Sequence, residues 1–268
     1  MPVMRSLALA LVVAVAPPTR ASEPPIPLQY NLAVDAAVTG AMLLSVALLT
    51  VYQSDLLPAA CRWCAPPAID AAVRNALVWE NGARTADLVS TVLDVAVPAS
   101  AFTYLLLSAN GGGDVNAGLV DALLVTEAAA AALLVNQVVK LLVGRQRPYA
   151  HFGNDLGYSR SEDNLSFYSG HTSLVFSVVA ATVTLASMRG YAGAGIVAGV
   201  GFTMGLGIGY LRIAADQHYL TDVLVGAVIG GLVGWAVPRI FHSPEPASPA
   251  APTGSALRAP AFSFRFAF

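Results

Sequence analysis

Residues 172–211 read TSLVFSVVAATVTLASMRGYAGAGIVAGVGFTMGLGIGYL and contain one charged residue, Arg189. Arg189 and Gly190 divide this stretch into two apolar runs, 172–188 and 192–211. Each run is close to the roughly 20 residues that a helix needs to cross a bilayer. Because the turn between them is so short, the two runs are predicted to be antiparallel neighbours. The stretch therefore predicts a pair of membrane-spanning helices.

The rest of the chain has the same apolar character. Hydrophobic residues make up 56% of the sequence, charged residues 11%, and the mean hydropathy is +0.65. A soluble domain carries roughly 25% charged residues, so this chain has too little charge to cover a water-facing surface. Disorder, collagen and, at a net charge of −2, a basic nucleic-acid binder are excluded. Four further runs of spanning length lie at about 31–53, 85–108, 116–143 and 219–241. The predicted fold class is all-α, a polytopic membrane helix bundle with about six transmembrane helices.

Both ends of the chain differ from these spans. Residues 1–21 are typical of a signal segment, because their apolar run, Leu7–Ala16, is short for a span. Residues 243–268 are rich in proline and alanine and are predicted to form a disordered tail. Between them we predict a first transmembrane helix with its loop over 22–84 and a catalytic helix bundle over 85–242.

Three polar clusters interrupt the apolar pattern, and the first ends the run 116–143. Charged groups in membrane-spanning segments are costly, so their placement is informative. Lys140 is the chain's sole lysine, and Arg147 follows it seven residues later, which places both on one helix face. Gly144 and Pro148 favour unwinding of the helix before Arg147. Alternatively, both cations simply extend toward the membrane surface from a helix end.

The second cluster is Ser169-Gly170-His171, at the start of the run 172–188. Serine is a favoured N-cap, and glycine leaves the backbone open to a ligand. Free N–H groups at a helix N-terminus form an anion site. The alternative is an ordinary capped helix followed by a histidine at the membrane surface.

The third cluster is Arg212, His218 and Asp222, between the last two spans. His218 and Asp222 are four residues apart and would share a helix face. Asp222 is expected to accept the Nδ1–H of His218, which leaves Nε2 with a free lone pair. This is the histidine–carboxylate half of a nucleophilic site, although a purely structural pair is the alternative.

Span topology brings the three clusters together. Six antiparallel spans place all of these helix ends on one membrane face. Three cations, an N–H-rich helix start and two histidines on that face indicate phosphate transfer. The sequence shows no carboxylate cluster there that would hold two metal ions, so the cations are expected to neutralise the phosphate.

The three clusters resemble the signature motifs of the type 2 phosphatidic acid phosphatase (PAP2) superfamily, which also contains vanadium-dependent haloperoxidases. The matching residues are Lys140-x6-Arg147-Pro148, Ser169-Gly170-His171 and Arg212-x5-His218-x3-Asp222. The resemblance covers about residues 84–241. Two positions depart from it, since Tyr168 replaces the usual proline and Leu211 the usual serine. These differences concern the shape of the loop.

The resemblance implies a role for each motif residue. His218, oriented by Asp222, attacks phosphorus to form a phosphohistidine, while His171 protonates the leaving oxygen and then activates water. The non-bridging oxygens are held by Lys140, Arg147, Arg212, the Ser169 hydroxyl and the Gly170 N–H. The implied activity is hydrolysis of a lipid phosphate or diphosphate monoester among membrane lipids, with no metal ion, cofactor or nucleic acid. A vanadate-dependent peroxidase and a non-enzymatic transporter using the intramembrane carboxylates are the alternatives.

The predicted location is a bacterial-type inner membrane, crossed several times. A cleaved signal at 1–21 would place the site in the cytoplasm by span parity, whereas the resemblance implies the opposite face. Cys61 and Cys64 lie in a loop on the site's face, which favours an oxidising compartment. We therefore predict that the site faces away from the cytoplasm.

The remaining polar residues give weaker signals. Cys61-x-x-Cys64 is interpreted as a local disulfide or two unpaired thiols rather than a redox centre. Asp87 and Asp94 share a helix face and are predicted to pair within the bundle or to lie near its ends. His242 shows no partner in the sequence and is predicted to be a surface residue.

Overall fold

The computed structural model describes residues 23–56, 60–154 and 156–245. The signal-like segment 1–21 and all but the first three residues of the tail 243–268 lie outside the described residues. The described chain is a helical bundle, and 6 of its helices are long and apolar enough to cross a membrane. The predicted fold class is confirmed.

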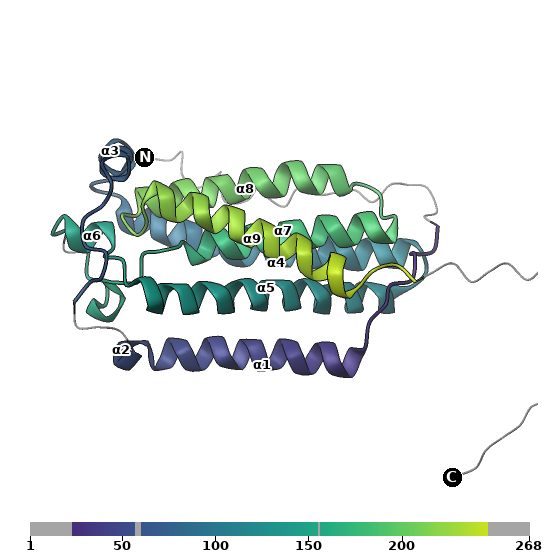
Figure 1. The fold of residues 1–268 in the computed structure, drawn as a ribbon. Coiled ribbons are helices and arrows are strands. Elements are labelled where there is room, and N and C mark those ends of the chain that lie inside the picture. The colour runs from purple at the N-terminus through teal and green to yellow at the C-terminus, as the bar shows by residue number, and fades with distance from the viewer. Residues whose placement is uncertain (1–22, 57–59, 155, 246–268) are drawn as a thin grey trace, which may run out of the picture.

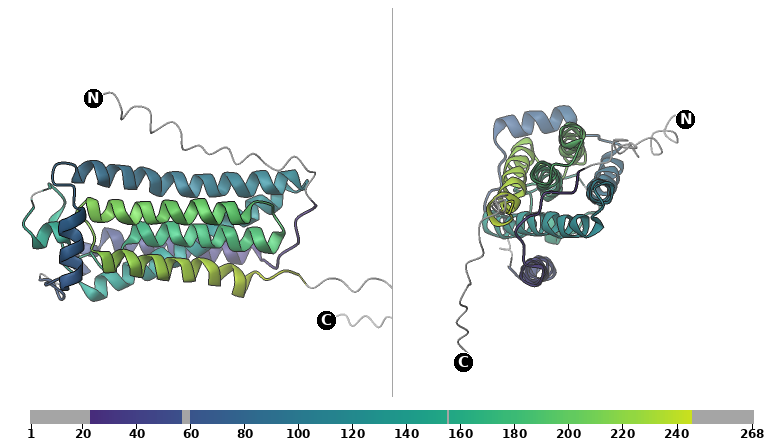
Figure 2. Two further views of the ribbon diagram at one scale, coloured as in Figure 1. Left: turned by 90° about the horizontal axis from the view of Figure 1, so that it is seen from above. Right: turned by 90° about the vertical axis from the view of Figure 1, so that its right-hand side faces the viewer.

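The six spanning helices run side by side along one direction (Figures 1 and 2). They are α1 (Leu32–Val51), α4 (Ala83–Gly111), α5 (Val115–Val143), α7 (Gly170–Arg189), α8 (Ala194–Ala214) and α9 (Leu220–Phe241). The short elements are α2 (Gln53–Leu56), α3 (Ala68–Leu77), α6 (Pro148–His151) and the 3₁₀ helix η2 (Arg160–Glu162). These connect the spans at one end of the bundle, here named the α3 end, and Figure 2 shows α3 lying across it.

The outward faces of the spans are apolar. Large apolar side chains are exposed on each span except α7, and they include Leu44, Leu88, Leu142, Leu206 and Leu232. In water such a surface would be unfavourable, but in a bilayer it faces hydrocarbon. The chain is a multi-pass membrane protein.

The helix α7 is the most buried span, and α9 packs against it backbone to backbone. A Cβ built at Gly230 or Gly234 would lie 2.2 Å from the carbonyl oxygen of Ser173 or Ser177. Small residues four apart allow this approach without a hydrophobic driving force. This contact fixes the middle of α9 against the first half of α7.

Substitution of Gly230 by alanine should destabilise the fold, because the new methyl group would overlap the Ser173 carbonyl. Overpacking of this kind costs about 1–3 kcal/mol. Thermal unfolding of the purified protein in detergent measures the effect as a fall in Tm. Gly231→Ala is the matched control, because a Cβ there meets nothing within 4 Å. Equal Tm values for the two variants would contradict backbone contact between α7 and α9.

Candidate active site

The three sequence motifs meet at the α3 end of the bundle. The backbone N–H of Ser169 donates to the carbonyl of Asp222 at 3.0 Å, which ties the start of α7 to α9. The side-chain amide of Asn136 on α5 donates to the carbonyl of Tyr168 at 2.7 Å. These two hydrogen bonds tie the start of α7 to α9 and to α5, the helix that carries Lys140. The prediction that the clusters share one end of the bundle is confirmed.

Lys140 faces the first turn of α7. A Cβ on Gly170 would lie 3.4 Å from the Nζ of Lys140 and 2.9 Å from the Oδ1 of Asn136, so only glycine fits this position without displacing them. Within the described residues, the Lys140 ammonium makes no hydrogen bond or ion pair. The backbone N–H groups of Gly170 and His171 likewise have no partner there. A free cation and free helix N-terminal donors form an anion site.

Ser169 is the N-cap of α7, as predicted. Its hydroxyl oxygen accepts hydrogen bonds from the N–H of Thr172 at 3.5 Å and from the Thr172 hydroxyl at 3.0 Å. Its own O–H remains available as a donor. The helix α5 ends at Val143, Gly144 adopts a φ of 57°, and Arg147 is extended. The predicted unwinding before Arg147 is confirmed.

Arg147 and Arg212 are buried and already have partners. Arg147 donates to the carbonyl of Glu162 at 2.9 Å and contacts the side chain of Gln217. Arg212 pairs with Asp87 of α4 and donates to Ser90 at 3.2 Å. A bound phosphate would replace some of these contacts. The two guanidinium groups are thus held in position before any substrate arrives.

The proton on His218 is fixed differently from the sequence prediction. Its Nδ1 lies 2.8 Å from the carbonyl oxygen of Ser166, whereas Oδ2 of Asp222 is 3.7 Å away. Asp222 is therefore not the direct hydrogen-bond partner of His218. A carbonyl oxygen can only accept, so Nδ1 carries the proton and Nε2 keeps its lone pair. The tautomer with the proton on Nδ1 is the one predicted, but the acceptor is the Ser166 carbonyl and not Asp222.

Asp222 acts instead as the centre of a buried network. It accepts hydrogen bonds from the Ser166 hydroxyl at 2.6 Å and from the Tyr219 N–H at 2.8 Å. It also pairs with Arg145 at 2.5 Å. Because the Ser166 carbonyl holds the His218 ring while its hydroxyl holds Asp222, the carboxylate positions the ring through Ser166.

Arg145 lies two residues before Arg147 and is not part of the three motifs. In the structure its side chain is 1% exposed and bridges Asp222 and Asp70 of α3, the latter at 2.7 Å. Its guanidinium lies 4.0 Å from the ring centre of Trp63 and 4.3 Å from that of Tyr219. Asp70 is 75 residues from Arg145 in sequence, so no local pattern indicated this contact.

The loop that carries Trp63 is closed by a disulfide between Cys61 and Cys64. Of the alternatives weighed from the sequence, the structure shows the local disulfide. Trp63 also accepts a hydrogen bond from the N–H of Gln146 at 3.0 Å. The disulfide loop therefore packs directly on the segment that links Lys140 to Arg147.

His218 is surrounded by positive charge. Burial lowers the pKa of His218 well below its usual range, and the nearby charges of Arg147, Arg212 and Lys140 lower it further. A low pKa keeps the imidazole neutral at physiological pH. A neutral imidazole with a free lone pair is the form that attacks phosphorus.

His171 lies at the more open side of the cluster. Its side chain is 28% exposed, and its Nε2 is 3.8 Å from a carboxylate oxygen of Asp94 on α4. Asp87, about two helical turns earlier on α4, pairs with Arg212. The two aspartates therefore do not pair with each other, as one prediction had it, but each faces a motif residue. Their helical spacing was the signal that placed them on one face.

The cluster is buried in this structure, and His218 is 1% exposed. A polar recess of about 370 Å³ lies beside the cluster and is lined by Arg74, Asn154 and Asp216, among others. A second, apolar groove of about 420 Å³ lies on the outer face between α7, α8 and α9. Neither hollow is lined by His218.

Comparison with known families agrees with this geometry. The family model described as the PAP2 superfamily matches residues 121–245. Residues 121–245 are thus similar to the PAP2 superfamily. The chain is also similar to the crystal structure described as the first transmembrane PAP2 type phosphatidylglycerolphosphate phosphatase from Bacillus subtilis. The sequence identity is 20%, the match covers 76% of this chain and 94% of that chain, and the TM-score is 0.38. The comparison with curated proteins gives no significant match.

The PAP2 region contains all three motifs but not all of the residues that support them. Asp70 on α3 and Asp87 on α4 lie before residue 121, where the family match begins. These carboxylates hold Arg145 and Arg212, respectively. The preceding helices thus complete the charge balance of the PAP2 site.

Proposed function

We propose that this protein is a membrane phosphatase that hydrolyses a lipid phosphate or diphosphate monoester through a phosphohistidine. The observation that carries the proposal is His218, whose Nδ1–H is held by Ser166 and whose free Nε2 lies among three cations. A neutral nucleophile surrounded by fixed positive charge suits a phosphoryl group, whose oxygens carry the negative charge.

In the first step, Nε2 of His218 attacks phosphorus and the bond from phosphorus to the lipid oxygen breaks. His171 gives its proton to that leaving oxygen, and Asp94 beside it stabilises the protonated ring. In the second step, His171 takes a proton from water as the water oxygen attacks phosphorus. The phosphorus–nitrogen bond then breaks. Inorganic phosphate leaves, and His218 returns to its neutral form.

The remaining residues hold charge throughout both steps. Lys140 and the Gly170 N–H bind the non-bridging oxygens with the Ser169 hydroxyl, and Arg147 and Arg212 exchange their present partners for those oxygens. Because the α3 end lies where the spanning helices terminate, a headgroup can enter while its tails stay in the bilayer. This position favours a lipid as substrate over a soluble phosphate.

Release of inorganic phosphate by the purified protein in detergent micelles tests the proposal. The substrates would be phosphatidic acid, phosphatidylglycerol phosphate, a polyprenyl diphosphate and lipid A phosphate, with p-nitrophenyl phosphate as the soluble comparison. We expect turnover of at least one lipid without added divalent metal, blocked by vanadate. No release from any lipid, or oxidation of halide by peroxide, would reject the proposal.

We further propose that the site faces away from the cytoplasm, which the Cys61–Cys64 disulfide at the α3 end supports. Single cysteines at Ser159, on the α3 end, and at Asn116, at the opposite end, test this in a variant with both native cysteines replaced by serine. Both positions are exposed. With a membrane-impermeant thiol reagent, the Ser159 position should label in cells with an intact inner membrane. The Asn116 position should label only after the inner membrane is broken, and the reverse pattern would place the site in the cytoplasm.

A further inference from the structure

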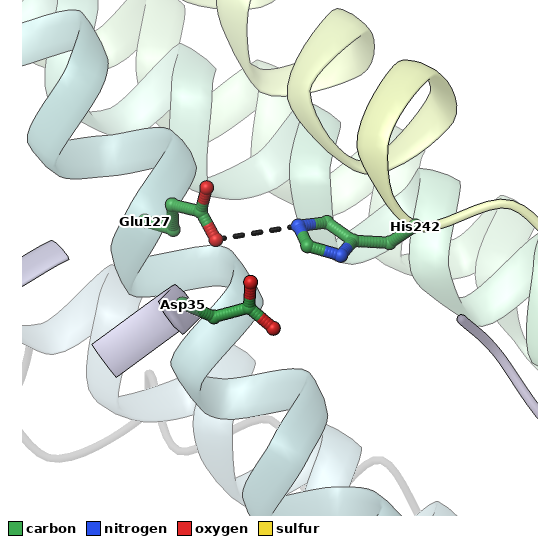
Figure 3. A group of neighbouring side chains, drawn as sticks. All are labelled: Asp35, Glu127 and His242. Carbon is green, nitrogen blue, oxygen red and sulfur yellow. Dashed lines mark hydrogen bonds and ion pairs between the residues drawn. The ribbon is translucent and has the colours of Figure 1, made fainter. Parts of the chain in front are cut away.

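His242 is not the surface residue that its sequence context predicted. It follows the last residue of α9, at the end of the bundle opposite the α3 end, and is 2% exposed. Two carboxylates are buried beside it, Asp35 on α1 and Glu127 on α5, each 8% exposed. Figure 3 shows the three side chains converging on one space from three separate parts of the chain.

The distances within this triad suit a bound cation. One ligand atom from each of the three residues lies within 4.8 Å of the other two. The Nε2 of His242 is 3.2 Å from Oε2 of Glu127. Two ligands in a tetrahedral zinc site lie about 3.3 Å apart when each bond to zinc is about 2.0–2.1 Å. A small inward movement of Asp35 would complete three protein ligands.

The hydrogen bond on the other side of the His242 ring agrees with this arrangement. Nδ1 lies 3.3 Å from the carbonyl oxygen of Gln29. A carbonyl accepts only, so Nδ1 carries a proton, and Nε2 faces the Glu127 carboxylate, where it either donates a hydrogen bond or, with a metal ion bound, gives its lone pair to the metal. Metal-binding histidines are usually oriented in this way, by donation of the second N–H to a backbone carbonyl.

The charge balance of the triad also favours a bound cation. Two buried carboxylates face one imidazole, and among the described residues no lysine or arginine pairs with either. Uncompensated negative charge at a membrane-spanning position is unfavourable. By contrast, Asp121 at the same end of the bundle is neutralised by Arg189 at 2.7 Å.

The helix α1 supplies an independent observation. Its two buried residues are Asp35 and Thr39, one turn apart on the same face. Helical threonines such as Thr50 and Thr126 donate to the carbonyl four residues before them. Thr39 is 4% exposed, and its hydroxyl has no hydrogen-bond partner among the described residues. On the buried face of α1, Asp35 accepts a hydrogen bond from the Asn31 N–H at 2.9 Å, while the Thr39 hydroxyl is left without a partner among the described residues.

We propose that Asp35, Glu127 and His242 bind a divalent transition metal, zinc in the first place, which fastens α1 to α5 and to the end of α9. One imidazole nitrogen and two carboxylate oxygens form a ligand set suited to Zn²⁺. The site lies at the opposite end from His218 and takes no part in phosphate transfer. Its role is structural, since α1 packs against α5 at the edge of the bundle (Figure 1).

Metal analysis of the full-length protein tests this proposal directly. The protein is purified through an affinity tag without histidines, from cells grown with zinc, and its metal content is measured by mass spectrometry. We expect about one Zn²⁺ per chain, as for a dedicated protein site. Asp35→Asn, Glu127→Gln and His242→Gln should each lose it. His151→Gln, at an exposed histidine, and Asp121→Asn, at a buried acid paired with Arg189, should retain it.

A second measurement does not depend on the folding of the variants. Wild-type protein stripped with a chelator should unfold at lower temperature, and added Zn²⁺ should restore Tm, because a ligand bound only to the folded state stabilises it. Failure of Zn²⁺, Mn²⁺ and Co²⁺ to raise the Tm of stripped protein would overturn the proposal. Full zinc content in all three triad variants would also overturn it. So would wild-type protein purified without zinc, which is the result expected if Glu127 and His242 form only an ion pair.

Discussion

Replacement of His218 by alanine should abolish phosphatase turnover while the fold survives. The imidazole supplies the attacking Nε2, and the alanine methyl group cannot form a bond to phosphorus. Removal of a catalytic nucleophile lowers kcat by roughly 10⁶-fold in a well-studied hydrolase, so activity should fall to background. Acid-quenched labelling with radioactive lipid phosphate should show a phosphoenzyme in the wild type and none in His218→Ala.

His171→Ala provides the contrast within the same site. It should still form the phosphoenzyme from a substrate with a good leaving group but should hydrolyse it slowly, because His171 acts on the leaving oxygen and on water. A normal phosphoenzyme in His218→Ala, with none in His171→Ala, would reverse the two assignments. Unfolding measurements on both variants separate lost chemistry from lost structure.

The pH profile should reflect the surroundings of His218. Burial, followed by the charges of Arg147, Arg212 and Lys140, lowers its pKa, so the neutral nucleophile persists below the usual histidine pKa of about 6.5. Activity should therefore be lost only as the pH falls below that value. In Arg147→Ala one of these charges is gone, and the acid limb of kcat/KM should move to higher pH. An unchanged limb would show that another group controls it.

The sequence predicted the fold well because length and hydropathy determine a membrane-spanning helix almost alone. The run 172–188 became α7 with small changes at its ends, and Ser169 caps it as its residue type suggested. Arg189 and Gly190 end α7, as the short turn required. The glycines of α9 stand four residues apart, which is typical of close packing, but the spacing alone does not identify the backbone of α7 as the partner.

The sequence predicted the motif residues of the site but not the residues that hold them in position. Helical spacing suggested that Asp222 holds His218, yet α9 begins at Leu220, so His218 precedes the helix and turns to Ser166 instead. The contact between Arg145 and Asp70 joins residues far apart in sequence. The partners of Asp87 and His242 were missed for the same reason, because tertiary contacts across helices leave no local pattern.

Lys140, Arg147 and Arg212 should act on one phosphate, and each replacement by alanine should lower kcat/KM by about 100-fold or more. Lys140 faces the free N–H groups of α7 and has no partner among the described residues, while both arginines are preset by their partners. Since the three charges neutralise one group, the double variants should lose far less than the product of the single losses. Arg160→Ala is the control, because Arg160 is exposed at the same end of the bundle.

A variant of the carboxylate that holds Arg212 distinguishes a residue that contacts the phosphate from one that only positions another residue. Asp87→Asn removes the carboxylate that holds Arg212 but leaves the guanidinium in place, so it should weaken activity less than Arg212→Ala. The two losses should not add in the double variant, because Asp87 acts through Arg212. If Lys140→Ala keeps near-normal kcat/KM while the arginine variants lose it, Lys140 is an anchor at the membrane surface, and two cations suffice for the phosphate. Fully additive losses among all three would instead place them on different groups of the substrate, as a diphosphate would allow.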